Sequence, residues 1–398
     1  MHTKGSKFIL PVIVLAQFLC TSLWFAGNGV MDDLVAEYNL GHDALGLLTS
    51  AVQLGFIIGT LAFAIFTIAD RYSPSLVFMI SAAFGMLFNA GLIWEGNSIQ
   101  SLLIFRFLTG FFLAGIYPVG MKIAADHFDK GLGRSLGYLL GALVLGTALP
   151  HLLRDVVKDL SWQYVMITTS CLALSGGLFV FLFIPDGPYR KKSGGIKLSA
   201  FTRVFRNKDL RSAAFGYFGH MWELYSFWAF IPFILKQIKE SDPGSQLNIP
   251  LWAFIVIAAG MPACIAGGYI SQTIGHKKTA FIALLLSCAC CLISPVIIGN
   301  ADIGIVLLFL IFWSMMVIPD SPMFSTLVAN NSDPELKATA LTIVNCIGFS
   351  ITIISIMLIS ELALFIDLQY LFLFLALGPV VGLIALGQGD RIRSRVNS

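Results

Sequence analysis

The chain has 398 residues and a formal net charge of +3, with 57% hydrophobic and only 12% charged residues. A soluble domain carries about 25% charged residues, so this composition excludes a soluble enzyme and indicates a chain surrounded mostly by lipid. Phosphate-binding loops and zinc-binding spacings are missing from the sequence. We therefore expect no enzymatic activity, no catalytic residue, no cofactor and no metal.

Twelve apolar runs follow one another along the chain, each near the roughly 20 residues that a helix needs to cross about 30 Å of hydrocarbon. They predict an all-α membrane protein with 12 transmembrane helices. The predicted spans cover residues 8–31, 44–68, 74–94, 100–125, 132–153, 161–184, 211–235, 250–274, 279–298, 303–328, 338–360 and 366–387. The first run is too long for the core of a cleaved signal peptide, and it lacks a small-residue cleavage pattern.

One polar interruption, at 185–210, is much longer than the others, is rich in Lys and Arg, and leaves six predicted spans on each side. We expect it to be a basic cytoplasmic linker between two six-helix bundles. The N-terminal bundle then covers 1–184 and the C-terminal bundle 211–390, followed by a cytoplasmic tail at 391–398.

The basic residues are distributed unevenly between the two sides of the membrane. With the N-terminus inside, 20 of the 25 Lys and Arg residues fall in inner loops, four fall in outer loops, and Arg106 alone lies within a span. Cytoplasmic loops carry an excess of Lys and Arg, so both termini are predicted to be cytoplasmic. The basic loops can lie against an anionic leaflet, which accounts for the net charge without nucleic acid.

The two halves of the chain share landmarks at a nearly constant offset. Asp70 and Gln272 follow the second and eighth spans and are 202 positions apart, and Pro118 and Pro319 in spans four and ten are 201 apart. The span starts near 8 and 211 differ by 203. This agreement indicates duplication of a six-span unit, which is a known plan of transporters.

The seven cysteines all fall within predicted spans, so no disulfide framework is expected. Cys288, Cys290 and Cys291 are close enough in sequence for a metal site, but no His or carboxylate accompanies them in the sequence. Packing against lipid or neighbouring helices is the favoured interpretation of the three thiols.

The loop after the eighth predicted span has a recognisable pattern. Gly268 is followed after three residues by Gln272, and Gly275 is followed by basic residues. This pattern resembles a loop motif of the major facilitator superfamily, and Arg106-x-x-x-Gly110 is similar to the family's motif in the fourth span. The first copy of the loop keeps Asp70 and Arg71 but has Phe66, Ser73 and Pro74 where the family has two glycines and a base.

The resemblance implies two pseudo-symmetric six-helix bundles that move a solute by alternating access. It also implies that spans one, four, seven and ten line the central path. Polar residues are costly in lipid and usually face a cavity or a partner, and these four spans hold most of them. The substrate-binding candidates share helical faces of these spans: Gln17, Thr21, Trp24, Asn28, Arg106, Tyr117, His220, Glu223, Phe227 and Trp313.

Arg106 and Glu223 are predicted to lie at similar depth, from a rise of about 1.5 Å per residue. We expect the two side chains to attract each other, and hypothesise that they exchange partners during transport; a static structural pair is the alternative. Glu223 and His220 lie one turn apart and can both titrate, so they are candidates for proton coupling. Asp320 is a second coupling or gate residue, or simply a helix cap.

A further set of residues is predicted to form gates or bends at the inner ends of the spans. The prolines remove backbone hydrogen bonds and kink helices, and the others belong to the inner loops. The gating candidates are Asp70, Arg71, Pro118, Gln272, Gly275, Pro319 and Pro322.

The sequence therefore predicts a secondary active transporter that moves a small organic anion or zwitterion across the bacterial inner membrane, with the proton as coupling ion and with the chain acting as a monomer. Symport is favoured because an antiporter motif is not cleanly present in span five. Two alternatives stay open: proton-driven efflux of amphipathic compounds, and a sensor or scaffold with the same fold that transports nothing.

Overall fold

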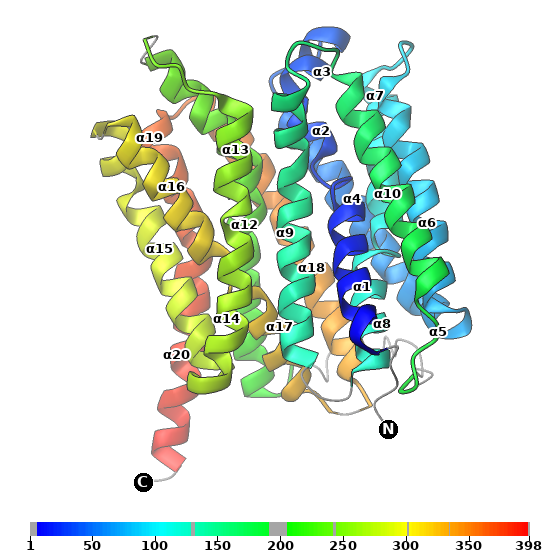
Figure 1. Cartoon of the computed structure of the whole chain (residues 1–398). Helices are drawn as coiled ribbons and strands as arrows, with labels where there is room; N and C mark the ends of the chain where they lie inside the picture. The colour runs from blue at the N-terminus through cyan, green and yellow to red at the C-terminus, as the bar shows by residue number, and fades with distance from the viewer. Residues whose placement is uncertain are drawn as a thin grey trace.

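The computed structural model of the protein describes residues 6–128, 132–190, 205–241, 244–300, 302–333 and 335–396, and in these ranges the regular structure is helical, with no strand. The first described helix begins and the last ends at the same end of the molecule, the lower end in Figure 1. We call this the terminal end, and the other the distal end.

The helices of the first half gather on one side of the molecule (Figure 1). They are α1 (Ser6–Thr21), α2 (Ala26–Gly29), α3 (Met31–Tyr38), α4 (Ala44–Ile65), α5 (Ile68–Arg71), α6 (Pro74–Ala90), η1 (Gly91–Ile93), α7 (Ile99–Leu113), α8 (Tyr117–His127), α9 (Leu132–Val156) and α10 (Gln163–Phe183).

The second half of the chain supplies the remaining helices, most of which gather on the other side. They are α12 (Lys208–Ser241), α13 (Ile249–Ala258), α14 (Gly260–Ile274), α15 (His276–Asn300), α16 (Ile303–Val317), α17 (Ser321–Asn330), α18 (Lys337–Leu362), α19 (Leu368–Leu371), η3 (Phe372–Ala376) and α20 (Leu377–Val396).

Ten helical segments of the described residues are long and apolar enough to cross a membrane, which makes the chain a multi-pass membrane protein. Two of the twelve predicted spans, the first and the seventh, do not meet these criteria of length and apolar composition. Phe8–Thr21 is apolar but shorter, because the helix ends at Thr21. The other, α12, is 34 residues long and carries Lys and Asp in its first turn and Lys in its last turn.

Several predicted spans are interrupted helices, including the twelfth, where the 3₁₀ segment η3 separates α19 from α20. The breaks predicted in spans four and ten are confirmed, since α7 gives way to α8 and α16 to α17. Pro118 and Pro322 both lie within the first two positions of the second segment, where a missing N–H costs no helical bond. The structural counterpart of Pro118 is therefore Pro322, and the predicted match with Pro319 was wrong. Spans one and eight, predicted as continuous, break after Thr21 and at Ala259.

Close helix packing within the first half depends on glycine. A Cβ atom at Gly110 of α7 would lie 2.0 Å from the carbonyl oxygen of Val52 on α4, and one at Gly55 would lie 1.9 Å from that of Phe107. No side chain fits these positions, so the two backbones touch directly. The two halves meet where α4 packs on α18 and where α9 packs on α13 and α14.

Candidate functional site

The break in the first span is held by Arg106 of α7. Its guanidinium donates hydrogen bonds to the carbonyl oxygens of Leu23, at 3.1 Å, and of Trp24. Both carbonyls belong to the turn between α1 and α2, where bonds of the 3₁₀ type replace the regular helical ladder. The predicted face of Gln17, Thr21, Trp24 and Asn28 is therefore not one continuous helical stripe.

Arg106 is almost completely buried and has no acidic partner among the described residues. Its Nε also makes no hydrogen bond with them, and it lies beside Gly27, where a Cβ atom would be 3.3 Å away. The expected Arg106–Glu223 pair is absent from this structure, because the guanidinium instead binds the buried carbonyl oxygens at the break in the first span. An uncompensated buried cation is costly, and an anion can relieve that cost.

Glu223 of α12 points instead into the interior of the second half. Its Oε1 accepts hydrogen bonds from Ser287 of α15, from Trp313 Nε1 of α16 at 2.6 Å, and from Cys291 Sγ at 3.3 Å. A carboxylate thus does accompany the cysteine cluster, although it comes from a different helix. Its Oε2 is buried with no hydrogen-bond partner among the described residues. The ring of Phe227 packs on Trp313 with centroids 4.5 Å apart, which fixes the indole donor.

A second buried pair lies one turn away on α12. His220 Nδ1 is 2.8 Å from Asp320 Oδ1, an ion pair when the imidazole is protonated, and both side chains are at most 1% exposed. Asp320 occupies the N-cap position of α17, directly after the break in span ten, but its side chain makes no capping hydrogen bond. The rings of Tyr217 and Phe324 flank His220. His220 and Glu223, predicted to act together, have different partners.

Four aromatic side chains join the two halves in the middle of the molecule. We call Trp24, Phe56, Tyr225 and Phe349 the aromatic cluster. Trp24 lies 4.8 Å from Phe56 on α4, and it stacks on Tyr225 of α12 at 5.7 Å and on Phe349 of α18 at 5.8 Å between ring centroids. Its Nε1 has no hydrogen-bond partner among the described residues. Because Arg106 holds the backbone of Trp24, the cation lies directly behind this cluster.

A small inner pocket of about 30 Å³ adjoins the aromatic cluster on its terminal side. Tyr117, Tyr217 and Tyr225 line it, and their hydroxyls make no hydrogen bond with described residues. Ile318 and Ser321 also line it, on either side of Asp320 in the sequence. Tyr117 is thus the predicted substrate-binding residue that reaches this pocket.

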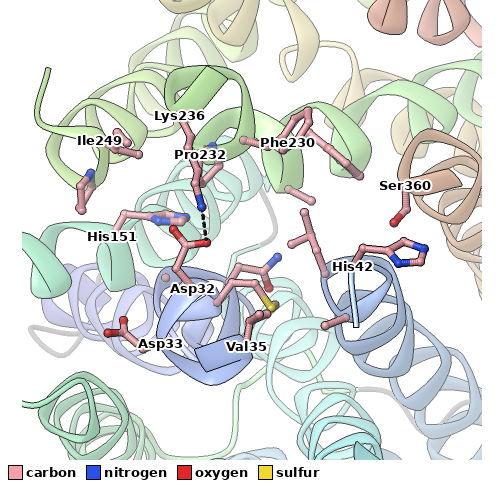
Figure 2. A pocket seen from close by; sticks show the side chains of 18 of the residues that line it. Asp32, Asp33, Val35, His42, His151, Phe230, Pro232, Lys236, Ile249 and Ser360 are labelled. Atoms are coloured by element: carbon pink, nitrogen blue, oxygen red, sulfur yellow. Dashed lines mark hydrogen bonds and ion pairs between the residues drawn. The ribbon is translucent and has the colours of Figure 1, made fainter. Parts of the chain in front are cut away.

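A larger outer cavity of about 570 Å³ lies on the distal side of the aromatic cluster, between the two halves. On α12, the pocket-lining Tyr225 and the cavity-lining Ala229 are separated by one turn. Asn28 reaches the cavity and donates to Thr49 Oγ1 at 2.9 Å. Figure 2 shows several of its polar residues, including Asp32, Lys236 and His151.

The remaining predicted site residues have local roles. Both amide atoms of Gln17 are buried without a hydrogen-bond partner among the described residues, and its Oε1 occupies the space that Gly120 leaves free. Thr21 bonds back to the carbonyl of Gln17 at 2.8 Å. Gln53 was missed, although it is fully buried with both amide atoms unpartnered. The spacing of Thr49, Gln53, Phe56 and Thr60 indicates one helical face and could have identified it.

The gating candidates lie at the terminal end. Asp70 forms a 2.9 Å ion pair with Lys122 of α8, while Arg71 donates to Thr67. Arg190 donates to the carbonyl oxygens of Asp70 and Tyr72, and so supplies a base that the first loop lacks. In the second copy, Gly275 has a φ of +88°, which favours glycine. Gly267 packs against Pro319, while the exposed Gln272 belongs to the last turn of α14.

These features define a helical membrane protein with two packed halves and costly polar groups buried between and inside them. A family model described as the Major Facilitator Superfamily matches residues 13–357. The chain belongs to this family, is a transporter, and is not an enzyme.

Relatives by sequence are distant. The chain is 22% identical over 274 residues to the "Probable sulfoacetate transporter SauU" of Cupriavidus necator, a match that spans 61% of each protein. It is 24% identical over 301 residues to the "Uncharacterized transporter YgaY" of Escherichia coli O157:H7, over 71% of this chain and 73% of the relative.

Similar solved structures cover nearly the whole fold. The human organic anion transporter MFSD10 has a TM-score of 0.76 at 17% identity, with 96% of this chain and 99% of that protein covered. The proton:xylose symporter XylE has a TM-score of 0.76 at 13% identity, with 98% and 96% covered. These likenesses concern the fold.

Proposed function

We propose that this transporter moves a small organic anion or zwitterion by alternating access, coupled to protons. The observation that carries the proposal is Arg106, a buried cation without an acidic partner among the described residues. Arginine is charged at all physiological pH values and offers a fork of donors suited to carboxylate or sulfonate oxygens. A bound anion restores the charge balance that the protein itself leaves open.

The aromatic cluster connects this cation to the transport path. Trp24 has its backbone held by Arg106 and its ring on Tyr225 and Phe349. A shift of Trp24 therefore moves the broken segment between α1 and α2 and changes what Arg106 contacts. We infer that the solute meets Arg106 and the three tyrosine hydroxyls of the inner pocket once the cluster separates.

Proton coupling is assigned to the second half. Ionisable groups inside membrane segments are expensive and are commonly part of proton relays. Glu223 keeps one oxygen without a partner, and His220 and Asp320 form a closed pair beside the inner pocket. We infer that one of these acids takes up a proton in each cycle, and that its neutralisation lets α12 move against α16 and α17.

The topology we propose follows from the charge distribution. Twelve spans, with the terminal end in the cytoplasm, form bundles at 1–184 and 211–390, joined by the linker at 185–210, in the inner membrane of a bacterium. The gates then lie at the cytoplasmic ends, where Pro118 and Pro322 begin α8 and α17. A single chain contains both halves of the path and acts as a monomer.

The names of two similar proteins agree with an organic anion as the ligand. One sequence relative is named for sulfoacetate, an organic anion, and one protein of similar fold is named as an organic anion transporter. Proton-driven efflux of amphipathic compounds is the second candidate, because the aromatic cluster offers apolar surface and other relatives are named efflux pumps.

Uptake into proteoliposomes tests the proposal directly. Purified protein is reconstituted, an inward proton gradient is imposed, and entry of radiolabelled sulfoacetate, taurine, xylose and choline is measured. We expect the anion or the zwitterion to accumulate, and xylose and choline to stay at the level of empty liposomes. Entry of choline or xylose instead contradicts the proposed ligand class, and loss of preloaded dye with no anion uptake supports efflux.

A further inference from the structure

The outer cavity carries more basic than acidic groups once its ion pairs are counted. Arg154 is neutralised by two hydrogen bonds to Asp33, at 2.8 and 2.9 Å, and Lys236 contacts Asp32 at 3.2 Å. Lys158 of the cavity wall has no acidic partner among the described residues, and His42 and His151 add two imidazoles. The cavity therefore has a surplus of groups that can donate to an anion.

His151 is the side chain in the cavity best placed to bind a ligand. Its side chain is only 2% exposed, it lines the cavity from α9, and its Nε2 has no hydrogen-bond partner among the described residues. Figure 2 shows the ring extending towards Asp32 and Lys236. A buried polar group without a partner is costly, and a bound oxygen acceptor satisfies it.

The Asp32–Lys236 contact is a weak link between the two halves of the protein. Asp32 belongs to α3 and Lys236 to α12, and their side chains are 81% and 46% exposed. An ion pair this exposed contributes little to stability, because water and salt screen it. A small anion at the same place competes with the Asp32 carboxylate for the Lys236 ammonium.

We propose that the outer cavity is a second anion site, in which the carboxylate or sulfonate of a small organic solute replaces Asp32 on Lys236 and accepts a hydrogen bond from His151. The ligand class rests on the proposed function, but the site is separate from the centre at Arg106. Occupation of the cavity releases the polar link between α3 and α12, so loading of the distal side loosens contact between the halves.

Acylation of lysines tests this proposal without any transport step. Purified full-length protein in detergent is treated with a water-soluble N-hydroxysuccinimide ester at matched ionic strength, with sulfoacetate as the probe. Modification of Lys236 and Lys239 is then followed by mass spectrometry. Both lysines are exposed on the last turns of α12, but only Lys236 lines the cavity, so Lys239 is an internal control.

We expect saturating sulfoacetate to slow acylation of Lys236 by about fivefold or more, as near-complete occupancy requires, and to leave Lys239 unchanged. The variant His151→Gln should need about tenfold more sulfoacetate for the same protection, whereas choline should protect neither lysine. Equal slowing of both lysines, or none at Lys236, overturns the proposal. If sulfoacetate protects Lys236 but the protein takes up no solute, the anion site is supported and only the proposed transport function is contradicted.

Discussion

The Nδ1 atom of His220 lies 2.8 Å from Oδ1 of Asp320, with both side chains excluded from solvent. The pair joins α12 to the start of α17, directly after the interruption of span ten. Breaking a buried pair by removal of one partner leaves an uncompensated group and costs about 3–5 kcal/mol. In the proposed cycle, a proton on Asp320 weakens this pair and so couples protonation to movement of the broken span.

We expect the variant Asp320→Asn to impair proton coupling much more than solute binding. The amide has nearly the shape of the carboxylate but cannot take up a proton, so we expect proton-driven uptake of sulfoacetate to fall by about tenfold or more. Exchange of labelled for unlabelled sulfoacetate, which needs no net proton movement, should change by less than about twofold in the same proteoliposomes. Asp302→Asn, at the exposed N-cap of α16, is the matched control. Equal losses in uptake and exchange contradict a coupling role for Asp320.

The hydrogen bond from Ser287 to Glu223 is predicted to contribute to the stability of the fold. We expect Ser287→Ala to lower the free energy of unfolding by about 1–3 kcal/mol, because a buried carboxylate loses a donor. Ser294→Ala on the same helix removes only a bond to the carbonyl of Cys291 and should cost less than about 1 kcal/mol. Thermal unfolding followed by circular dichroism in one detergent compares the two, and equal midpoints refute the contact.

Arg106 should stabilise the broken first span as well as bind solute. Arg106→Gln leaves the carbonyls of Leu23 and Trp24 without their charged donor, so we expect a loss of about 1–3 kcal/mol in stability per carbonyl, together with loss of sulfoacetate binding. Arg106→Lys keeps the charge but not the fork, and should recover binding only in part. Arg211→Gln removes an exposed arginine of α12 and serves as the control. Undiminished binding by Arg106→Gln contradicts the assigned role.

The contact between α4 and α7 gives a prediction about packing alone. Gly110→Ala places a methyl group 2.0 Å from the carbonyl oxygen of Val52, and we expect the overpacking to cost about 1–3 kcal/mol or more. Gly304→Ala on α16 meets no atom within 4 Å, so it should be neutral or stabilise by about 0.5–1 kcal/mol. Midpoints of thermal unfolding measured side by side decide the matter; the opposite order contradicts the close approach of the two helices.

Much of the architecture could be predicted because it depends on local chemistry. Apolar runs indicate membrane helices, and prolines at 118 and 322 indicate the breaks in spans four and ten. The break after Thr21 has no such marker. It depends on Arg106, which is 82 and 83 positions from the carbonyls that it binds.

The candidate site was harder to predict, since helical faces give direction but not partners. The spacing of His220 and Glu223 is typical of one shared face, yet one side chain meets Asp320 and the other Ser287 and Trp313. Of the residues that line the outer cavity, only Asn28 was among the predicted site residues. Asp32, His151 and Lys236 lie in three separate segments without a motif, and only the assembled fold brings them to one wall.

The most direct test of coupled anion transport measures proton movement and solute movement in the same vesicles. Proteoliposomes that enclose a pH-sensitive dye receive external sulfoacetate with no imposed gradient, and entry of labelled sulfoacetate is followed in parallel. Proton-coupled import predicts that the lumen acidifies as sulfoacetate enters, that xylose causes neither change, and that Asp320→Asn abolishes the acidification. Saturable entry of sulfoacetate at constant lumenal pH contradicts proton coupling, and no entry above empty liposomes contradicts this solute as a substrate.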